Sequence, residues 1–164
     1  MNYIPTQINQ PKIIKNDFST LPSKKEIEII SLASYQSNKL KIPIYSSKVE
    51  AGFTSPADDF IEEYLDLNDL LVKQPEATFF VRVSGKSMVD AGIFPGDILI
   101  VDRSLTAKDG KIIIANVDGD VTVKRLSMRD GKITLKSESS NHKDITITGE
   151  LHIWGVVTSV IHRV

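Results

Sequence analysis

Residues 111–135 read KIIIANVDGDVTVKRLSMRDGKITL, three apolar runs separated by Asp118-Gly119 and Asp130-Gly131. Aspartate and glycine both tolerate positive φ, so an Asp-Gly pair between apolar runs is typical of a two-residue β-hairpin. Two such pairs predict two consecutive hairpins. Antiparallel β structure is therefore the expected core of the chain.

Apolar runs outside this stretch extend the β pattern. The turn residues Pro95-Gly96-Asp97 lead into the run Ile98–Val101, and the chain closes with a strand candidate from Ile153 to Ile161. Because these runs are short and bounded by turn residues, the predicted fold class is mainly β, a compact antiparallel domain.

Two segments carry helical signals. Ser23 and Glu26 have the spacing of a capping box ahead of the isoleucine-rich residues 27–32, which predicts a short helix there. Pro56 can begin a helix over residues 57–71, in which four apolar side chains would share one face: Phe60, Ile61, Tyr64 and Leu65.

The composition excludes several classes of protein. The 164 residues are 41% hydrophobic and 25% charged, as in one soluble globular domain. Lys and Arg number 20 against 21 Asp and Glu, so the net charge of −1 gives no positive field to coat DNA, although a partner bound to DNA is compatible. The absence of cysteine excludes disulfides, cysteine zinc sites and cysteine nucleophiles.

The sequence shows no membrane or export signal. Its longest apolar runs, such as residues 98–101, fall far short of the roughly 20 residues of a membrane span. Residues 1–7 lack the basic start and apolar stretch of a signal peptide. We therefore expect a cytoplasmic protein with no membrane contact.

Residues 1–41 differ from the rest of the chain. They are rich in Asn, Gln, Lys and Ser and contain three prolines, and their apolar residues rarely cluster. We interpret them as a flexible polar arm ahead of a β-rich domain over residues 42–164. The arm is too short and too polar to form a helix-turn-helix by itself, so we expect no direct sequence-specific DNA binding.

Neither the histidines nor a Ser-x-x-Lys match points to chemistry. His142, His152 and His162 lack the three- or four-residue helical spacing with which two rings hold one ion, so no metal is expected. Ser140 and Lys143 match the pattern of penicillin-binding enzymes, but they stand in a polar loop, where those enzymes place the serine at the start of a helix.

The loop Ser84-Gly85-Lys86-Ser87-Met88 is more informative. It is not a phosphate loop, because Phe80 stands where that loop needs a glycine. It is not a nucleophile elbow either, because Val89 replaces the second glycine. An ordinary loop and a serine activated by another base both stay open.

Lys124 is a candidate for that base. A neutral lysine can take the proton of a serine, but its ordinary pKa of about 10.4 requires desolvation in an apolar pocket. Lys124 lies mid-strand and shares a side with Thr122 and Leu126, opposite Arg125. The alternation of side chains along the strand does not show which side is buried. Lys124 could therefore equally be a lysine that faces solvent.

Taken in order, three motifs resemble the self-cleaving serine/lysine peptidase family S24, which includes LexA and UmuD. They are Ser84–Met88, Gly96-Asp97 at the head of a strand, and Val121–Leu126. The resemblance covers residues 42–164. It implies the LexA/UmuD C-terminal β fold, catalytic roles for Ser87 and Lys124, and no cofactor.

The region upstream is similar to the cleavage region of that family, where an Ala-Gly or Cys-Gly bond is cut. The resemblance places the cut between Ala51 and Gly52. The spacings of 37 residues from Ser87 to Lys124 (124 − 87) and 35 from Gly52 to Ser87 (87 − 52) are those of the UmuD branch. Two further segments look like UmuD more than LexA: Gly52–Ala57 and Leu65–Leu71.

The UmuD branch implies a role in the SOS response to DNA damage. A RecA filament on single-stranded DNA would stimulate the cut. The shortened chain would then serve as accessory subunit of a UmuC-type Y-family translesion polymerase. The branch also implies a homodimer, for which the strand from Ile153 to Ile161 is a candidate contact.

Two departures and three alternatives accompany this reading. The arm is about twice as long as in the best-known UmuD, and Ala51 replaces the cysteine common before the scissile glycine.

A LexA-like repressor would need a DNA-binding module, which residues 1–41 do not supply. A membrane signal peptidase would need an anchoring helix. A binding module with an inactive site stays open.

Overall fold

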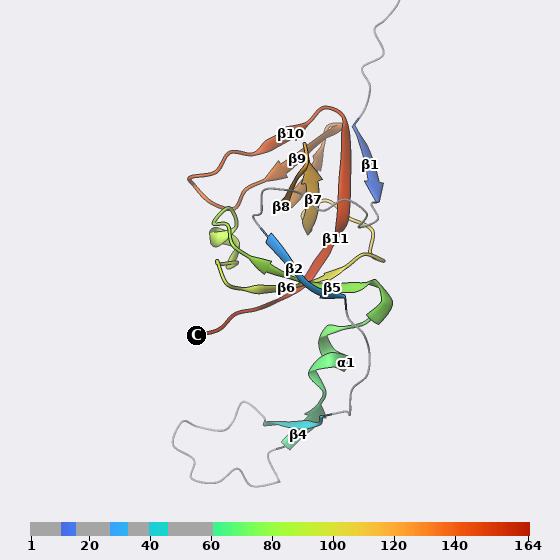
Figure 1. The fold of residues 1–164 in the computed structure, drawn as a ribbon, viewed down its shortest axis with the longest axis vertical. Helices are drawn as coiled ribbons and strands as arrows, with labels where there is room; N and C mark the ends of the chain where they lie inside the picture. Colours follow the sequence, from blue (N-terminus) through green and yellow to red (C-terminus); the bar gives the residue numbers. More distant parts are fainter. Residues whose placement is uncertain (1–10, 16–26, 33–39, 46–60) are drawn as a thin grey trace, which may run out of the picture.

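The computed structural model describes residues 11–15, 27–32, 40–45 and 61–164. Over these residues the chain is mainly antiparallel β structure, which confirms the predicted fold class (Figure 1). One sheet of nine strands has the order β10-β9-β8-β7-β11-β6-β5-β2, with β1 paired to β11. Its strands are β1 (Lys12–Lys15), β2 (Ile27–Leu32), β5 (Thr78–Val83), β6 (Ile98–Asp102), β7 (Ile112–Val117), β8 (Asp120–Arg129), β9 (Lys132–Lys136), β10 (Ile145–Ile147) and β11 (Glu150–Ile161).

Both predicted hairpins are confirmed. Asp118 and Gly119 have φ of 52° and 93° and join β7 to β8. Asp130 and Gly131 have φ of 51° and 71° and join β8 to β9. The left-handed backbone at all four positions is the conformation that a two-residue hairpin turn demands.

Two clusters of buried apolar side chains form the core. The first includes Phe79, Val81, Leu99, Val101, Val121, Val123 and Trp154. The second includes Ile113, Leu126, Leu135, Leu151 and Ile153. Strand β8 contributes to both clusters, and its residues 121–124 are all buried. This arrangement decides the environment of Lys124, which sequence alternation left open.

The helix predicted over residues 27–32 is wrong, because this segment is strand β2. It pairs antiparallel with β5, from Ile27 opposite Val83 to Leu32 opposite Phe79. Isoleucine fits a paired strand well, so the partner strand outweighs the local capping signal. Residues 23–26, which carry that signal, lie outside the described residues.

The helix predicted over residues 57–71 is confirmed at its end and wrong in the first half of its described length. Residues Ile61–Leu65 form β4, which pairs with β3 (Ile42–Tyr45), and only Leu67–Leu71 is helical, as α1. Asp66 begins the helix by accepting a hydrogen bond of 2.7 Å from the backbone N–H of Asn68. The same N–H lowers the pKa of the Asp66 carboxyl.

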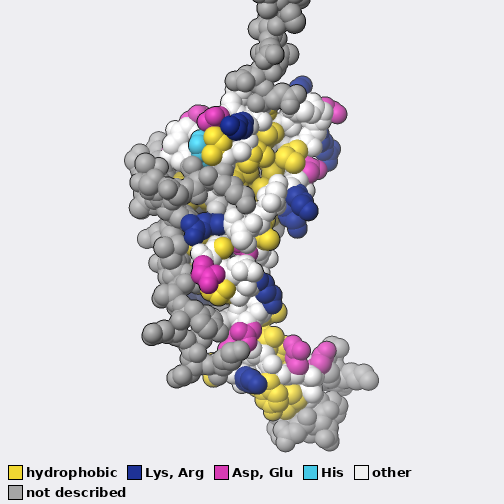
Figure 2. Space-filling view, turned by 90° about the vertical axis from the view of Figure 1, so that its right-hand side faces the viewer, with side chains coloured by type: hydrophobic (Ala, Val, Ile, Leu, Met, Phe, Trp, Pro, Cys, Tyr) yellow, Lys and Arg dark blue, Asp and Glu magenta, His cyan; other side chains and the backbone are white. Residues whose placement is uncertain are grey.

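The strands β3 and β4 form a separate two-stranded ribbon. Figure 1 shows the ribbon below the main sheet, with α1 between the ribbon and the sheet. Figure 2 shows apolar side chains gathered at this lower end of the molecule. The exposed apolar side chains of the ribbon and α1 are Ile42, Ile44, Tyr45, Tyr64, Leu67 and Leu70. The ribbon therefore presents apolar surface that the main sheet does not cover.

Strand β11 is only partly the exposed strand that we expected. Its first half pairs with β7 on one side and with β1 on the other, and Ile153–Val156 are buried. Apart from Glu150 at its start, the exposed residues of β11 lie at its end: Thr158, Val160 and Ile161. Among the described residues, α1 is the longest helix, and none could cross a bilayer.

Candidate active site

Ser87 and Lys124 come from elements far apart in the sequence. Strand β5 ends at Val83 and leads into the loop that carries Ser87, and Lys124 lies in the middle of β8. Both residues are 3% exposed. The Lys124 Nζ donates a hydrogen bond of 2.7 Å to Ser87 Oγ. The structure thus brings together the two candidate site residues of the sequence.

The Ser87 loop is held by backbone hydrogen bonds to the connection that follows β9. Glu138 N–H donates to Ser87 O at 2.8 Å, and Asp90 N–H donates to Glu138 O at 2.8 Å. The next side chain, Met88, is 2% exposed and belongs to the first core cluster. Ser87 is therefore fixed between the core and the β9–β10 connection.

The amine of Lys124 donates hydrogen bonds to neutral oxygen atoms of three described residues. Besides Ser87 Oγ, it donates to Thr122 Oγ1 at 2.8 Å and to Val123 O at 3.1 Å. Burial disfavours the charged form of a lysine, and neutral acceptors compensate for it less than a carboxylate would. Desolvation therefore acts against the charged form of this buried amine beside the serine hydroxyl.

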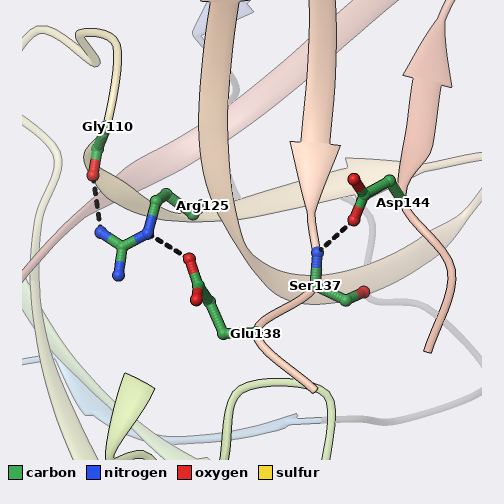
Figure 3. A network of polar contacts seen from close by, with 5 residues as sticks. All are labelled: Gly110, Arg125, Ser137, Glu138 and Asp144. Carbon is green, nitrogen blue, oxygen red and sulfur yellow. Dashed lines mark hydrogen bonds and ion pairs between the residues drawn. The ribbon is translucent and has the colours of Figure 1, made fainter. Parts of the chain in front are cut away.

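A polar network ties the strand of Lys124 to the loop of Ser87. The adjacent residue Arg125 donates from Nε to Glu138 Oε1 and from a terminal nitrogen to Gly110 O at 2.8 Å (Figure 3). Glu138 thus contacts Arg125 through its side chain and Ser87 through its backbone. The β9–β10 connection is further held by Ser137 N–H, which donates to Asp144 at 3.0 Å (Figure 3).

Two cavities lie next to the pair. A cavity of about 560 Å³ has Lys124 and Thr122 in its wall. Its other lining residues are Val117, Asp118, Asp120, Val121, Ser137, His142, Lys143 and Ile145. A cavity of about 10 Å³ is lined by Val83, Gly85, Ser87, Met88 and Val123. The large cavity can hold a peptide segment, and the small one has room for little more than a methyl group.

The three histidines lie apart from one another, each with different neighbours. His162 Nδ1 lies 2.7 Å from Asp97 Oδ1, and His152 lies 3.9 Å from Glu150. His142 is in the wall of the large cavity. Within the described ranges, no three His, Cys, Asp or Glu side chains are grouped to hold a metal ion.

Ala51 and Gly52 lie outside the described residues. The strands on either side of them are described, and they pair: Ile42 opposite Leu65 and Tyr45 opposite Ile61. Tyr45 and Ile61, which flank residues 46–60, thus lie next to each other.

Sequence reasoning missed Glu138. Its polar stretch gave no signal, because its role depends on contacts with Arg125, 13 residues away, and with the Ser87 loop. Thr122 could be anticipated, since alternation along a strand places it on the side of Lys124.

Comparisons with known proteins agree with these observations. Residues 43–158 match the family model described as Peptidase S24-like. Protein ImpA of Salmonella typhimurium is 46% identical over 122 residues, which cover 74% of this chain and 83% of ImpA. Protein MucA of Escherichia coli is 42% identical over 123 residues, covering 71% of this chain and 82% of MucA. A LexA repressor of Clostridium novyi is 31% identical over 159 residues, covering 96% of this chain and 76% of the repressor.

Proposed function

Because the chain belongs to the peptidase S24 family, as a member of its UmuD type, we propose that it cuts its own Ala51–Gly52 bond with Ser87 and Lys124. The observation that carries the proposal is the 2.7 Å separation of Lys124 Nζ and Ser87 Oγ, both in buried side chains. This is the distance over which a nucleophile hands its proton to a base.

In the proposed mechanism, Ser87 Oγ attacks the carbonyl carbon of Ala51 while neutral Lys124 takes the hydroxyl proton. Backbone N–H groups beside Ser87 stabilise the oxyanion. Lys124 then gives the proton to the leaving amine of Gly52. Water attacks the acyl-enzyme, Lys124 again acting as base, and Ser87 is restored with a new carboxylate at Ala51.

The small cavity beside Ser87 supports this choice of bond. With a volume of about 10 Å³, it has room for a group the size of the Ala51 methyl. Gly52, without a side chain, lets the backbone bend on the other side of the cut. The large cavity beside Lys124 would receive the neighbouring residues of the segment.

The ribbon of β3 and β4 supports a substrate within the same chain. It pairs the residues that flank the segment 46–60, and its exposed apolar side chains would lose contact with water on docking against the sheet. Tethering replaces a bimolecular encounter, and effective molarities for well-oriented groups reach roughly 10⁵–10⁸ M. A modest catalyst is then sufficient for a single turnover.

The proposed cellular role is that of the UmuD type in SOS mutagenesis. A RecA filament on single-stranded DNA would shift the population toward the docked segment and supply no catalytic group. Residues 52–164 would then act with a UmuC-type Y-family polymerase, as a homodimer in the cytoplasm. The exposed end of β11, at Thr158–Ile161, is the part of that strand available for a dimer contact.

A second candidate function is a LexA-like repressor that is cleaved after DNA damage. The identity to the Clostridium novyi repressor over 96% of this chain favours it. A gel-shift assay with the intact chain distinguishes the two. We expect no operator-specific shift, and a specific shift would favour the repressor.

The proposed chemistry is tested by the intact mass of the purified protein after incubation at alkaline pH. The wild type should give fragments 1–51 and 52–164. Ser87→Ala and Lys124→Ala should stay uncut, because each removes one half of the proton transfer. Circular dichroism and the unfolding temperature serve as the control for folding. A variant that folds and still yields 52–164 would exclude its residue from the mechanism.

A further inference from the structure

Two strands of the N-terminal arm are part of the main sheet. Strand β1 pairs in parallel with β11, from Lys12 opposite Glu150 to Lys15 opposite Ile153. Strand β2 pairs with the outer edge of β5, whose other edge pairs with β6. Figure 1 shows both arm strands beside the body of the sheet. Both precede Ala51 in the chain, so both belong to the fragment that self-cleavage would detach.

We propose that fragment 1–51 stays bound to residues 52–164 after the cut, as strands added to the sheet. Cutting the chain and uncovering the edges of β5 and β11 are then two separate steps, and the second requires displacement of the fragment. The inference rests on the proposed cleavage between Ala51 and Gly52.

Strand β1 has both a backbone and an apolar anchor. Lys12 N–H donates to Gly149 O at 3.2 Å, in addition to the pairing with β11. Ile13 packs on the second core cluster and lines a cavity of about 190 Å³, together with Leu105 and Ile153. Apolar burial at one position and backbone pairing at its neighbours are the features by which extended peptides bind a sheet edge.

Strand β2 covers the edge of the strand that leads to Ser87. Its first residue, Ile27, pairs with Val83, the last residue of β5 before the serine loop. Without β2, the backbone groups along that edge of β5 would lack these partners. An uncovered edge of this kind binds extended chains readily, and the detached arm would already be in place there.

Three strands of one fragment bind more tightly than any of them alone. Besides β1 and β2, strand β3 pairs with β4, from Ile42 opposite Leu65 to Tyr45 opposite Ile61. When one strand opens, the other two keep it close to its site, which gives a high effective concentration for rebinding. The fragment should therefore leave slowly, although the covalent link is broken.

The test begins with the full chain, cut by its own activity at alkaline pH and returned to neutral pH. Denaturing mass spectrometry counts the cut molecules, and native mass spectrometry shows whether the fragments stay together. We expect one 1–51 for each 52–164, with a summed mass that exceeds the uncut chain by one water. Free 52–164 in a fully cut sample would overturn the inference. An uncut sample in the denaturing measurement would instead overturn the proposed function.

A matched pair of variants tests whether the packing of Ile13 holds β1 on the sheet. Ile13→Ala removes the apolar anchor, and Lys12→Ala truncates the exposed neighbour on the same strand. Neither residue touches the Ser87–Lys124 pair, so both variants should be cut at the wild-type rate. The cut Ile13→Ala protein should lose its fragment several-fold faster than cut Lys12→Ala on size-exclusion chromatography. Equal loss from the two would contradict the docking of β1.

Discussion

The neighbours of Lys124 fix the direction of its amine. Its amine has a second side-chain acceptor, Thr122 Oγ1 at 2.8 Å, two residues earlier on β8. A hydroxyl in this position fixes the amine within reach of Ser87 without adding a charge. We regard Thr122 as a positioning residue for the proposed base.

Thr122→Val should lower the self-cleavage rate on the order of tenfold, because it keeps the shape of the side chain and removes the acceptor that orients the amine. The measurement is the rate constant as a function of pH. The reduction should persist at strongly alkaline pH, where the amine is neutral in both proteins. Thr146→Val, at an exposed threonine of β10, is the control. Rates that merge at high pH would contradict a role in orientation.

Glu138→Ala should slow self-cleavage several-fold, since its side chain links Arg125 to the backbone that holds Ser87. The Arg125 and Glu138 side chains are 34% and 29% exposed, so the loss of unfolding free energy should stay below about 1 kcal/mol. Glu150→Ala, at an exposed carboxylate, is the matched control. If the cleavage rates of Glu138→Ala and Glu150→Ala fall only in proportion to the drop in their unfolding temperatures, the role of Glu138 is purely structural.

Family motifs in the sequence point to Ser87 and Lys124, but the residues alone do not establish the burial of the lysine. Alternation assigns one buried side to a strand, whereas β8 contributes to both core clusters. Glu138 is beyond sequence reasoning, because its contacts arise only when the β9–β10 connection folds against the serine loop.

The hairpins and the arm strands differ in how far they could be predicted. The turns at Asp118-Gly119 and Asp130-Gly131 follow from local backbone preferences, so four residues are enough to identify them. Strand β2 pairs with β5, which lies some 50 residues later in the chain, and no local pattern contains that partner. The incorrect helix over residues 27–32 has this cause.

Gly155 in β11 allows that strand to approach β6 closely. A Cβ atom built at Gly155 would lie 2.7 Å from Val101 Cγ1 and 3.0 Å from Asp102 O. Gly155→Ala should therefore cost about 1–3 kcal/mol of unfolding free energy and lower the unfolding temperature by several degrees. Gly149→Ala is the control, because a Cβ there meets no atom within 4 Å. Equal unfolding temperatures for the two variants would contradict the close packing of β11 on β6.

The ribbon of β3 and β4 lies at the opposite end of the molecule from the strand that carries Lys124 (Figure 1). Figure 1 shows β4 and α1 at the lower end, whereas β7, β8 and β9 lie in the upper part of the sheet. In the proposed function the segment 46–60 must reach Ser87, so docking of the segment controls the cut. A RecA filament that favours the docked form would accelerate cleavage with no change in the Ser87–Lys124 pair.

The most direct test of the account is the first-order rate of self-cleavage between neutral and strongly alkaline pH, followed by the intact mass of fragment 52–164. Raising the pH deprotonates Lys124 and so increases the fraction of chains with a competent base. The rate should rise with pH and level off once the amine is neutral, and Lys124→Ala should stay uncut throughout. A rate that is constant over this range, or the same rise in Lys124→Ala, would contradict the lysine base.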